Sequence, residues 1–167
     1  MRNFDEWEIR PETYRKYIFV FCDGACIGNG RPGARAGYGV VFADPKLRHC
    51  IEAERLHDGP QTNSRAEILA LIRSAKLAPD DGRQVVIFSD SQYAMNCVVR
   101  WLDRWRCNGW RNTKGGIVAN QDLIEKLAEA LDEHRVRPVL QYIKGHSGHQ
   151  WNDMADAYAK AACRYDS

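Results

Sequence analysis

Apolar residues gather in five short runs that predict β-strands. The runs at residues 17–22, 36–43 and 85–89 are nearly continuous, as in strands whose two faces are both covered. The run at residues 49–56 alternates with polar residues and predicts a half-exposed strand. Residues 138–143 predict the fifth strand.

Other apolar positions take helical spacing. A stripe that begins after Ser64 stops before Pro79, which cannot continue a helix. Residues 91–103 and 150–164 predict two further helices, and Asn120 is placed to cap another. The predicted order is therefore three strands, a helix, a strand, two helices, a strand and a final helix.

This order predicts an α/β fold with a five-stranded mixed sheet flanked by helices. Three consecutive strands favour an antiparallel meander, whereas strands separated by helices favour parallel crossovers. The length of 167 residues suits one domain. We expect residues 1–16 to form a polar N-terminal extension and residues 17–167 to form the domain.

Charge and composition exclude several classes of protein. The net charge is +2, from 24 basic and 22 acidic side chains, so any basic surface must be local. No apolar run approaches the ~20 residues of a membrane span, and the N-terminus lacks the apolar core of an export signal. Without such a signal, the six cysteines favour reduced thiols over disulfides. We expect an intracellular, non-secreted monomer without membrane contact, in the nucleus, the cytoplasm or an organelle.

Two aspartates follow the two most apolar strand candidates. Asp23 comes directly after residues 17–22, and Asp90 comes directly after residues 85–89. The alternative interpretation of each is a turn former or a helix cap. Because ligands gather at the carboxyl ends of parallel strands, we expect the two carboxylates to lie close together, and their mutual repulsion would call for a cation.

Two further carboxylates are candidates for the same site. Glu67 has an alternative role, because Ser64-x-x-Glu67 matches a helix-capping box. Asp156 lies in the last predicted helix, where it would otherwise be an exposed helix charge. Four converging carboxylates suit Mg²⁺, and a pair of ions about 3.5–4 Å apart could hold both reacting oxygens of a phosphodiester.

His146 and His149 stand three residues apart before the last predicted helix. A zinc pair is one interpretation, although no third ligand is evident nearby, and loop packing is another. Beside a metal-bound phosphate, a histidine could instead move protons.

Residues 100–116, the basic protrusion, combine aromatic and basic side chains. Five basic residues and one acid give a net charge of 5 − 1 = +4, and Trp101 and Trp105 share one helix face. One interpretation is a solvated helix with its tryptophans packed on the core. The other is a nucleic-acid platform, in which rings stack on bases and cations neutralise phosphates. The basic residues are Arg100, Arg104, Arg106, Arg111 and Lys114.

Five features, in order, resemble the type 1 ribonuclease H family over about residues 17–163. They are F-C-D-G-A around Asp23, T-N-S-R-A-E ending at Glu67, S-D-S-Q around Asp90, the basic protrusion, and K-G-H-S-G-H-x-x-N-D-x-A-D ending at Asp156. The resemblance implies the RNase H-like fold. It also implies endonucleolytic hydrolysis of the RNA strand of RNA/DNA hybrids, leaving 5′-phosphate and 3′-hydroxyl ends.

Carried over residue by residue, the resemblance implies a site for two Mg²⁺ ions, with Mn²⁺ as a candidate substitute. Asp23 would bridge the ions, and Asp156 would hold the ion that activates the attacking water. Glu67 and Asp90 would hold the leaving-group side, and Glu67 would also meet an RNA 2′-hydroxyl. His146 would aid proton transfer or product release.

The resemblance also implies contacts with both strands of a hybrid. Minor-groove contacts would come from Cys26, Asn29, Asn63, Ser64 and Gln92. The DNA-strand channel and its phosphate pocket would be formed by Thr62, Trp101, Trp105, Thr113 and Asn120. The chain departs from the family pattern at Pro60, where eukaryotic members carry an arginine, and at Cys107, within a run that is often basic. We expect these departures to affect DNA-strand affinity rather than the chemistry.

Two other functions remain open at this point. One is a non-cleaving hybrid-binding or recruiting module on the same fold, because fold does not determine function. The other is a related nuclease, either the RNase H domain of a reverse transcriptase or a structure-specific DNA nuclease.

Overall fold

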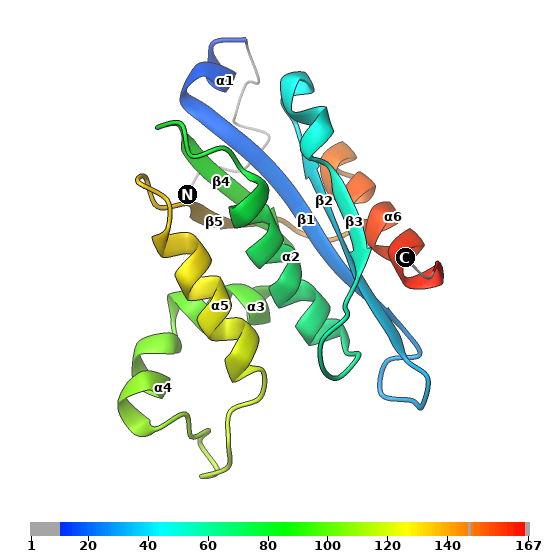
Figure 1. The fold of residues 1–167 in the computed structure, drawn as a ribbon, viewed down its shortest axis with the longest axis vertical. Helices are drawn as coiled ribbons and strands as arrows, with labels where there is room; N and C mark the ends of the chain where they lie inside the picture. The colour runs from blue at the N-terminus through cyan, green and yellow to red at the C-terminus, as the bar shows by residue number, and fades with distance from the viewer. Residues whose placement is uncertain (1–10, 147, 166–167) are drawn as a thin grey trace.

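Five strands form one mixed sheet, and helices cover both of its faces (Figure 1). The structure is a computed structural model that describes residues 11–146 and 148–165. The strands are β1 (Tyr17–Ile27), β2 (Arg35–Phe42), β3 (Glu52–Arg55), β4 (Gln84–Ser89) and β5 (Val139–Tyr142). Their order across the sheet is β3-β2-β1-β4-β5. The pairs β1–β2 and β2–β3 are antiparallel and the pairs β1–β4 and β4–β5 are parallel, which confirms the predicted topology.

The helices divide between the two faces of the sheet. They are α1 (Thr13–Lys16), α2 (Asn63–Leu77), α3 (Gln92–Val99), α4 (Leu102–Asn108), α5 (Gln121–Asp132) and α6 (Gln150–Arg164), with a 3₁₀ helix, η2 (Pro45–Cys50). Helix α6 contacts β1 and β2 on one face, whereas α2 covers β1 on the other and carries α5 on its outer side (Figure 1). None of the helices formed by the described residues has the length and apolar character needed to cross a bilayer.

The buried side chains of β1 alternate between these two layers. Val20 and Cys22 belong to the core under α2, whereas Phe19 and Phe21 belong to the core under α6. The ring of Phe21 stacks on that of Phe88 in β4, with centroids 4.6 Å apart and planes 9° apart. Side-chain period 2 therefore gives both faces of the sheet an apolar layer. All six cysteines are free, as expected.

Helix α6 approaches the sheet unusually closely at Gly39 of β2. A Cβ atom there would lie 2.6 Å from the carbonyl oxygen of Ala155, so any other residue would push the helix away. Since Asp156 is the next residue of α6, this close packing determines how far its carboxylate stands from the sheet.

Two predicted elements differ from the structure. The third strand is confined to Glu52–Arg55, because Asp44 caps η2 through a hydrogen bond from Lys46 N to its Oδ1 (2.9 Å) and residues 45–50 turn as a 3₁₀ helix. The helix predicted over 91–103 is two helices. The N–H groups of Arg100 and Trp101 both donate to the carbonyl of Asn96, which ends α3, and α4 continues to Asn108.

The predicted N-terminal extension lies partly outside the described residues. Its last part forms α1, which is tied to the domain by two hydrogen bonds. The Tyr14 hydroxyl donates to the carbonyl of Ala43 (3.4 Å), and the Arg83 guanidinium donates to the carbonyl of Tyr14 (3.0 Å). A domain boundary at residue 17 remains a prediction.

Candidate active site

Asp23 lies inside β1 rather than after it, which corrects the predicted end of the first strand. β1 continues to Ile27, and Asp23 pairs with Gly39 on the antiparallel side. On the other side, the parallel pairing with β4 ends at Phe21 and Phe88. Asp23 therefore stands just beyond the last parallel pair, and Asp90 directly follows β4 at the same end of the two strands.

Glu67 reaches the same point from α2. The alternative interpretation of Glu67, a capping box with Ser64, is wrong, because the helix begins earlier: Thr62 is the N-cap, and its Oγ1 accepts a hydrogen bond from Arg65 N (3.2 Å). The Glu67 carboxylate instead accepts from Gly24 N (3.2 Å). A Cβ atom on Gly24 would lie 2.4 Å from Glu67 N, so only glycine lets the first turns of α2 lie this close to β1.

Asp23, Glu67 and Asp90 form a tight carboxylate cluster. One oxygen of each lies within 4.8 Å of the others. Asp23 is 5% exposed and Glu67 is 7% exposed, so both carboxylates are largely withdrawn from water. Like charges in such surroundings are costly unless a cation or protons offset them.

The pKa values express this cost. Burial, followed by the charges of Glu67 and Asp90, raises the pKa of Asp23 to about 10. Burial and the charge of Asp90 raise the pKa of Glu67 to about 8. Burial also raises the pKa of Asp90. Three oxygen donors that are difficult to ionise together suit a hard divalent cation, so the chemistry of this cluster fits the metal site predicted from the sequence.

Asp156 adjoins the cluster from α6. Its Oδ2 lies 2.8 Å from the ammonium nitrogen of Lys160, one helical turn further along. Burial opposes ionisation of Asp156, but hydrogen bonds with Lys160 and Asp23 outweigh it and hold the pKa of Asp156 below its usual value. Among the described residues, Asp156 is the one of the four predicted carboxylates that forms an ion pair with a lysine.

The two histidines of the H-x-x-H motif have different surroundings. His146 is exposed, has a left-handed backbone (φ 55°), and favours the ionised forms of Asp90 and Asp156 through its charge. The His149 ring stacks on Phe21, with centroids 5.2 Å apart. Among the described residues, neither histidine belongs to a group that could hold a metal ion. Packing therefore accounts for His149, and His146 is the histidine beside the acids.

The residues expected to contact a hybrid lie on chain segments that adjoin the acids of the carboxylate cluster. The Asn29 side chain accepts a hydrogen bond from Asn63 N (3.1 Å), which ties the segment after β1 to the start of α2. The Cys26 thiol donates to the carbonyl of Gln61 (3.4 Å). Asn29, Asn63 and Gln92 are exposed, and Cys26 and Ser64 are half-buried. The five residues come from three segments that each lead into or out of an acidic residue of the cluster.

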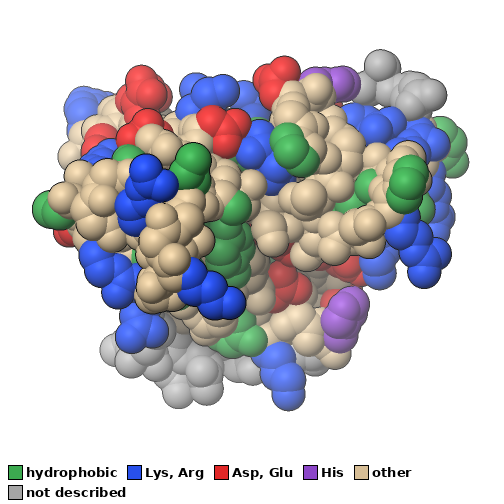
Figure 2. Space-filling model, turned by 90° about the horizontal axis from the view of Figure 1, so that it is seen from below, with side chains coloured by type: hydrophobic (Ala, Val, Ile, Leu, Met, Phe, Trp, Pro, Cys, Tyr) green, Lys and Arg blue, Asp and Glu red, His purple; other side chains and the backbone are tan. Residues whose placement is uncertain are grey.

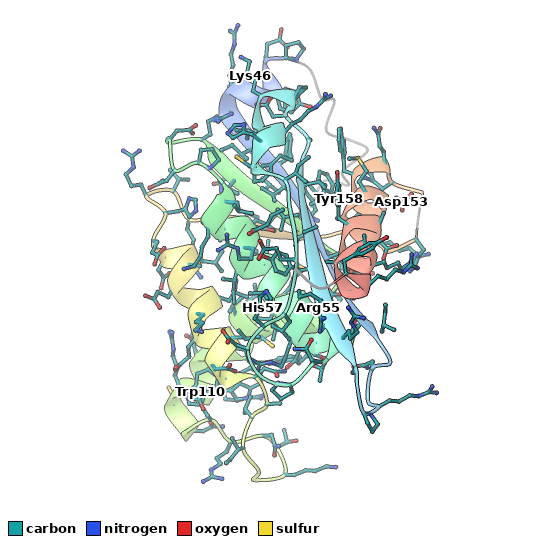
Figure 3. All side chains as sticks on the ribbon, turned by 45° about the vertical axis from the view of Figure 1, so that its right-hand side comes forward. Lys46, Arg55, His57, Trp110, Asp153 and Tyr158 are labelled. Atoms are coloured by element: carbon teal, nitrogen blue, oxygen red, sulfur yellow. The ribbon has the colours of Figure 1, made fainter. Side chains whose placement is uncertain are left out.

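Trp105 is buried beneath the surface of the basic protrusion, and its role in the DNA-strand channel stays a prediction. It is 8% exposed and Trp110 is 9% exposed, and both belong to the core under α2. The rings of Trp101, Trp105 and Trp110 follow one another at 5.6 and 5.9 Å. Trp101 is half-buried and is the ring of the three that a ligand can reach. Trp110 lies at the opposite end of the molecule from Lys46 of η2 (Figure 3).

The five basic residues of the protrusion are all exposed, but their surroundings differ. Arg106 lines a shallow pocket with four acidic side chains of α5 and the turn after it: Glu125, Glu129, Asp132 and Glu133. Arg104 and Arg106 lie on opposite flanks of the buried Trp105, since successive helical residues are turned by about 100°. Figure 2 shows Lys and Arg side chains on both sides of acidic side chains in the middle of this face.

Two residues of the site were missed by sequence reasoning. Lys160 could have been found, because it lies four residues after Asp156 and such pairs share a helix face. Arg65 stands within the T-N-S-R-A-E motif, but an arginine in a helical first turn gives no indication that it will be buried. Its guanidinium contacts Asp122 and Asn120 at the start of α5.

Comparison with known proteins identifies the family of this chain. The family model for RNase H matches residues 15–164. A ribonuclease H of Syntrophomonas wolfei is 38% identical over 150 residues, which cover 89% of this chain and 97% of that protein. The ribonuclease HI of Pasteurella multocida is 36% identical over 149 residues, which cover 88% of this chain and 90% of that protein.

Solved structures with the same fold include a type 1 RNase H and the RNase H domain of PFV. LC9-RNase H1, a type 1 RNase H with the type 2 active-site motif, is 28% identical with a TM-score of 0.65, covering 89% of this chain and 72% of that one. The RNase H domain of PFV is 26% identical with a TM-score of 0.66, covering 88% of this chain and 94% of that one. With a family model that spans nearly the whole domain and curated relatives of similar length, this chain belongs to the RNase H family of endonucleases.

Proposed function

We propose that this protein is a Mg²⁺-dependent ribonuclease H that hydrolyses the RNA strand of RNA/DNA hybrids with two metal ions, leaving 5′-phosphate and 3′-hydroxyl ends. The observation that carries the proposal is the carboxylate cluster, in which two buried acids from β1 and α2 and the half-buried acid after β4 each place one oxygen within 4.8 Å of the others. Curated relatives named ribonuclease H support the choice of substrate.

The four carboxylates would bind the two cations in different combinations. Asp23, at the centre of the cluster, would be shared between two ions, with Asp90 and Glu67 on one side and Asp156 on the other. Bound divalent ions would supply charge stabilisation at the scissile phosphate and an activated water. His146, exposed beside Asp90 and Asp156, is placed to accept or donate a proton at the edge of the site.

The surroundings of the cluster suit a hybrid duplex. Exposed Asn29, Asn63 and Gln92 offer amide groups around the acids, where they could meet minor-groove edges and RNA 2′-hydroxyls. On the side of α4, Trp101 and Thr113 would line the channel of the DNA strand, with Arg104 among the cations that approach its phosphates. The DNA strand is thus held by shape and charge while the RNA strand faces the carboxylates.

The proposal is tested with a labelled RNA/DNA hybrid, with and without Mg²⁺, beside matched RNA and DNA duplexes. We expect Mg²⁺-dependent cutting of the hybrid's RNA strand alone, and end-labelling should identify 5′-phosphate products. The same preparation of Asp90→Asn serves as the control for contaminating nuclease. Binding of the hybrid without cutting would overturn the proposal and favour a recruiting module, and cutting of duplex DNA would favour a different nuclease.

A further inference from the structure

A buried guanidinium lies at the start of α2, outside the carboxylate cluster. Arg65 is 4% exposed. Its two terminal nitrogens grip both carboxylate oxygens of Asp122 at 2.9 and 2.8 Å, and one of them also donates to the carbonyl of Asp58 (3.2 Å). This bidentate pair joins the first turn of α2 to the first turn of α5 and to the loop between β3 and α2.

Arg65 also contacts two side chains that the function would use. Its backbone N–H donates to Thr62 Oγ1 (3.2 Å), and its guanidinium donates to Asn120 Oδ1 (3.4 Å). Asn120 Nδ2 in turn donates to the Tyr93 hydroxyl (2.9 Å). Thr62 and Asn120 are therefore both held by the same residue, although they are 58 positions apart in the sequence.

These contacts determine which hydrogen-bonding groups face outward. A guanidinium only donates, so the Asn120 oxygen must turn toward Arg65 and its amide nitrogen away from it. That nitrogen has two protons, and Tyr93 takes one. The Thr62 oxygen already accepts from Arg65 N, which leaves its hydroxyl proton to donate elsewhere. Both side chains are thus arranged as donors, as an anion requires.

Two further observations mark this place as suited to an anion. Thr62 and Asn120 are the residues that precede α2 and α5, so two helix N-termini, each partially positive, meet here. The Nε of Arg65 is buried and has no hydrogen-bond partner among the described residues. Pro60 has no N–H and therefore contributes no backbone donor from the adjoining loop.

We propose that Arg65 is a positioning residue that fixes Thr62 and Asn120 as the two donors for one phosphate of the DNA strand. The inference rests on the proposed function, because it assumes a bound hybrid. It adds a residue that acts from behind the binding surface. The ion pair with Asp122 keeps the guanidinium in place, and the guanidinium determines the direction of the Asn120 amide, while the backbone N–H of Arg65 holds Thr62 Oγ1.

The first test is a double-mutant cycle on hybrid cleavage. Arg65→Met keeps most of the packing volume but removes the side-chain donors. We expect KM for the hybrid to rise about tenfold with kcat within about twofold of wild type, the size expected when one charge-assisted contact is lost. Asn120→Ala should raise KM similarly, and the double variant should be little worse than either single one.

The matched control is another arginine of the same helix. Arg73 grips Glu52 through two hydrogen bonds of 2.9 and 3.2 Å, as Arg65 grips Asp122, but it lies far along α2 from Thr62. Arg73→Met should lower the melting temperature without changing KM. If Arg65 has only a structural role, Arg65→Met will behave like Arg73→Met, and the proposal is overturned. Arg65→Lys keeps the charge but cannot bind both oxygens of Asp122 as a guanidinium does. It gives a folded comparison if Arg65→Met does not fold.

The second test locates the phosphate directly. Neutral methylphosphonate groups are placed one at a time along the DNA strand, and KM is measured for each hybrid. With the wild type, a methylphosphonate at one position should raise KM several-fold. With Arg65→Lys or Asn120→Ala, a methylphosphonate at that position should raise KM no more than one elsewhere. A scan whose profile is the same in all variants contradicts the role of Arg65. A wild type that cuts no hybrid contradicts the proposed function instead, so the two failures are distinguishable.

Discussion

The carboxylate cluster and the basic protrusion are both rich in charge, but the structure surrounds that charge very differently. Asp23, on the central strand β1, and Glu67, on α2, are buried beside Asp90, which follows β4. Arg104 and Arg106 are exposed side chains on the short helix α4. A buried charge costs free energy and so points to a ligand, whereas an exposed charge costs almost nothing and identifies none by itself.

The largest effect should come from the cluster. Asp90→Asn keeps the size of the side chain but removes a negative oxygen, so cleavage of the hybrid should fall by at least ~10³-fold. The fold should persist, because the substitution also removes like-charge repulsion. Single-turnover cleavage and a melting curve of the same sample measure both effects. Turnover close to that of the wild type would show that Asp90 is not part of the reaction.

Within the basic protrusion, the buried Trp105 and the half-buried Trp101 should respond differently to substitution. Trp105→Ala should lower the free energy of unfolding by about 3–5 kcal/mol, because it leaves a cavity between Trp101 and Trp110. Trp101→Ala should cost less stability and should weaken hybrid binding, as expected for the ring that can be reached from outside. Urea denaturation and binding titrations separate the two. Equal losses of stability would mean that both rings belong to the core alone.

The stability of the metal-free protein should depend on pH with a definite sign. Unfolded carboxyl groups have pKa values of about 4. The folded values are raised to about 8 for Glu67 and about 10 for Asp23. Between these limits the folded state holds protons that the unfolded state has lost, so the free energy of unfolding falls as pH rises, by at most about 1.4 kcal/mol per pH unit for each group.

Melting curves in a chelator, from pH ~5 to pH ~9, test this dependence. The stabilisation should be complete below about pH 4 and should be lost as pH rises through the folded pKa values. Mg²⁺ should flatten the curve, and Asp23→Asn should flatten it without Mg²⁺. A melting temperature that stays level or rises across this range in the metal-free wild type would contradict the raised pKa values.

The smallest effect should separate the two arginines of α4. Arg106 already faces the acidic side chains of α5, whereas Arg104 lies on the other flank. Arg104→Gln should therefore reduce the slope of log affinity against log salt by about 0.7–0.9, the contribution of one phosphate contact, and Arg106→Gln should leave it nearly unchanged. Lys46→Gln, at the opposite end of the molecule, is the control for net charge (Figure 3). An unchanged slope in Arg104→Gln would exclude that contact.

The sequence predicted the features that depend on local residue patterns. It did not predict the features that depend on tertiary packing. Apolar runs located every strand of the sheet, and two acids that follow apolar runs located the cluster. The capping box that the sequence offered as an alternative role for Glu67 does not form, because α2 begins one residue before Ser64 and Thr62 is the cap. No periodicity distinguishes Trp105 from Trp101, since both lie on one helix face and only the neighbours of that face decide which ring is covered.

The stacked rings of Phe21 and Phe88 have a consequence for how the protein responds to heat. They end the parallel pairing just before Asp23 and Asp90, so the base of the site is part of the core under α6. Residues in such a core are exposed only when the whole domain unfolds, whereas sites on loops are often lost by local unfolding at lower temperature. Thermal inactivation should therefore coincide with global melting, and the acids should retain their arrangement up to that temperature.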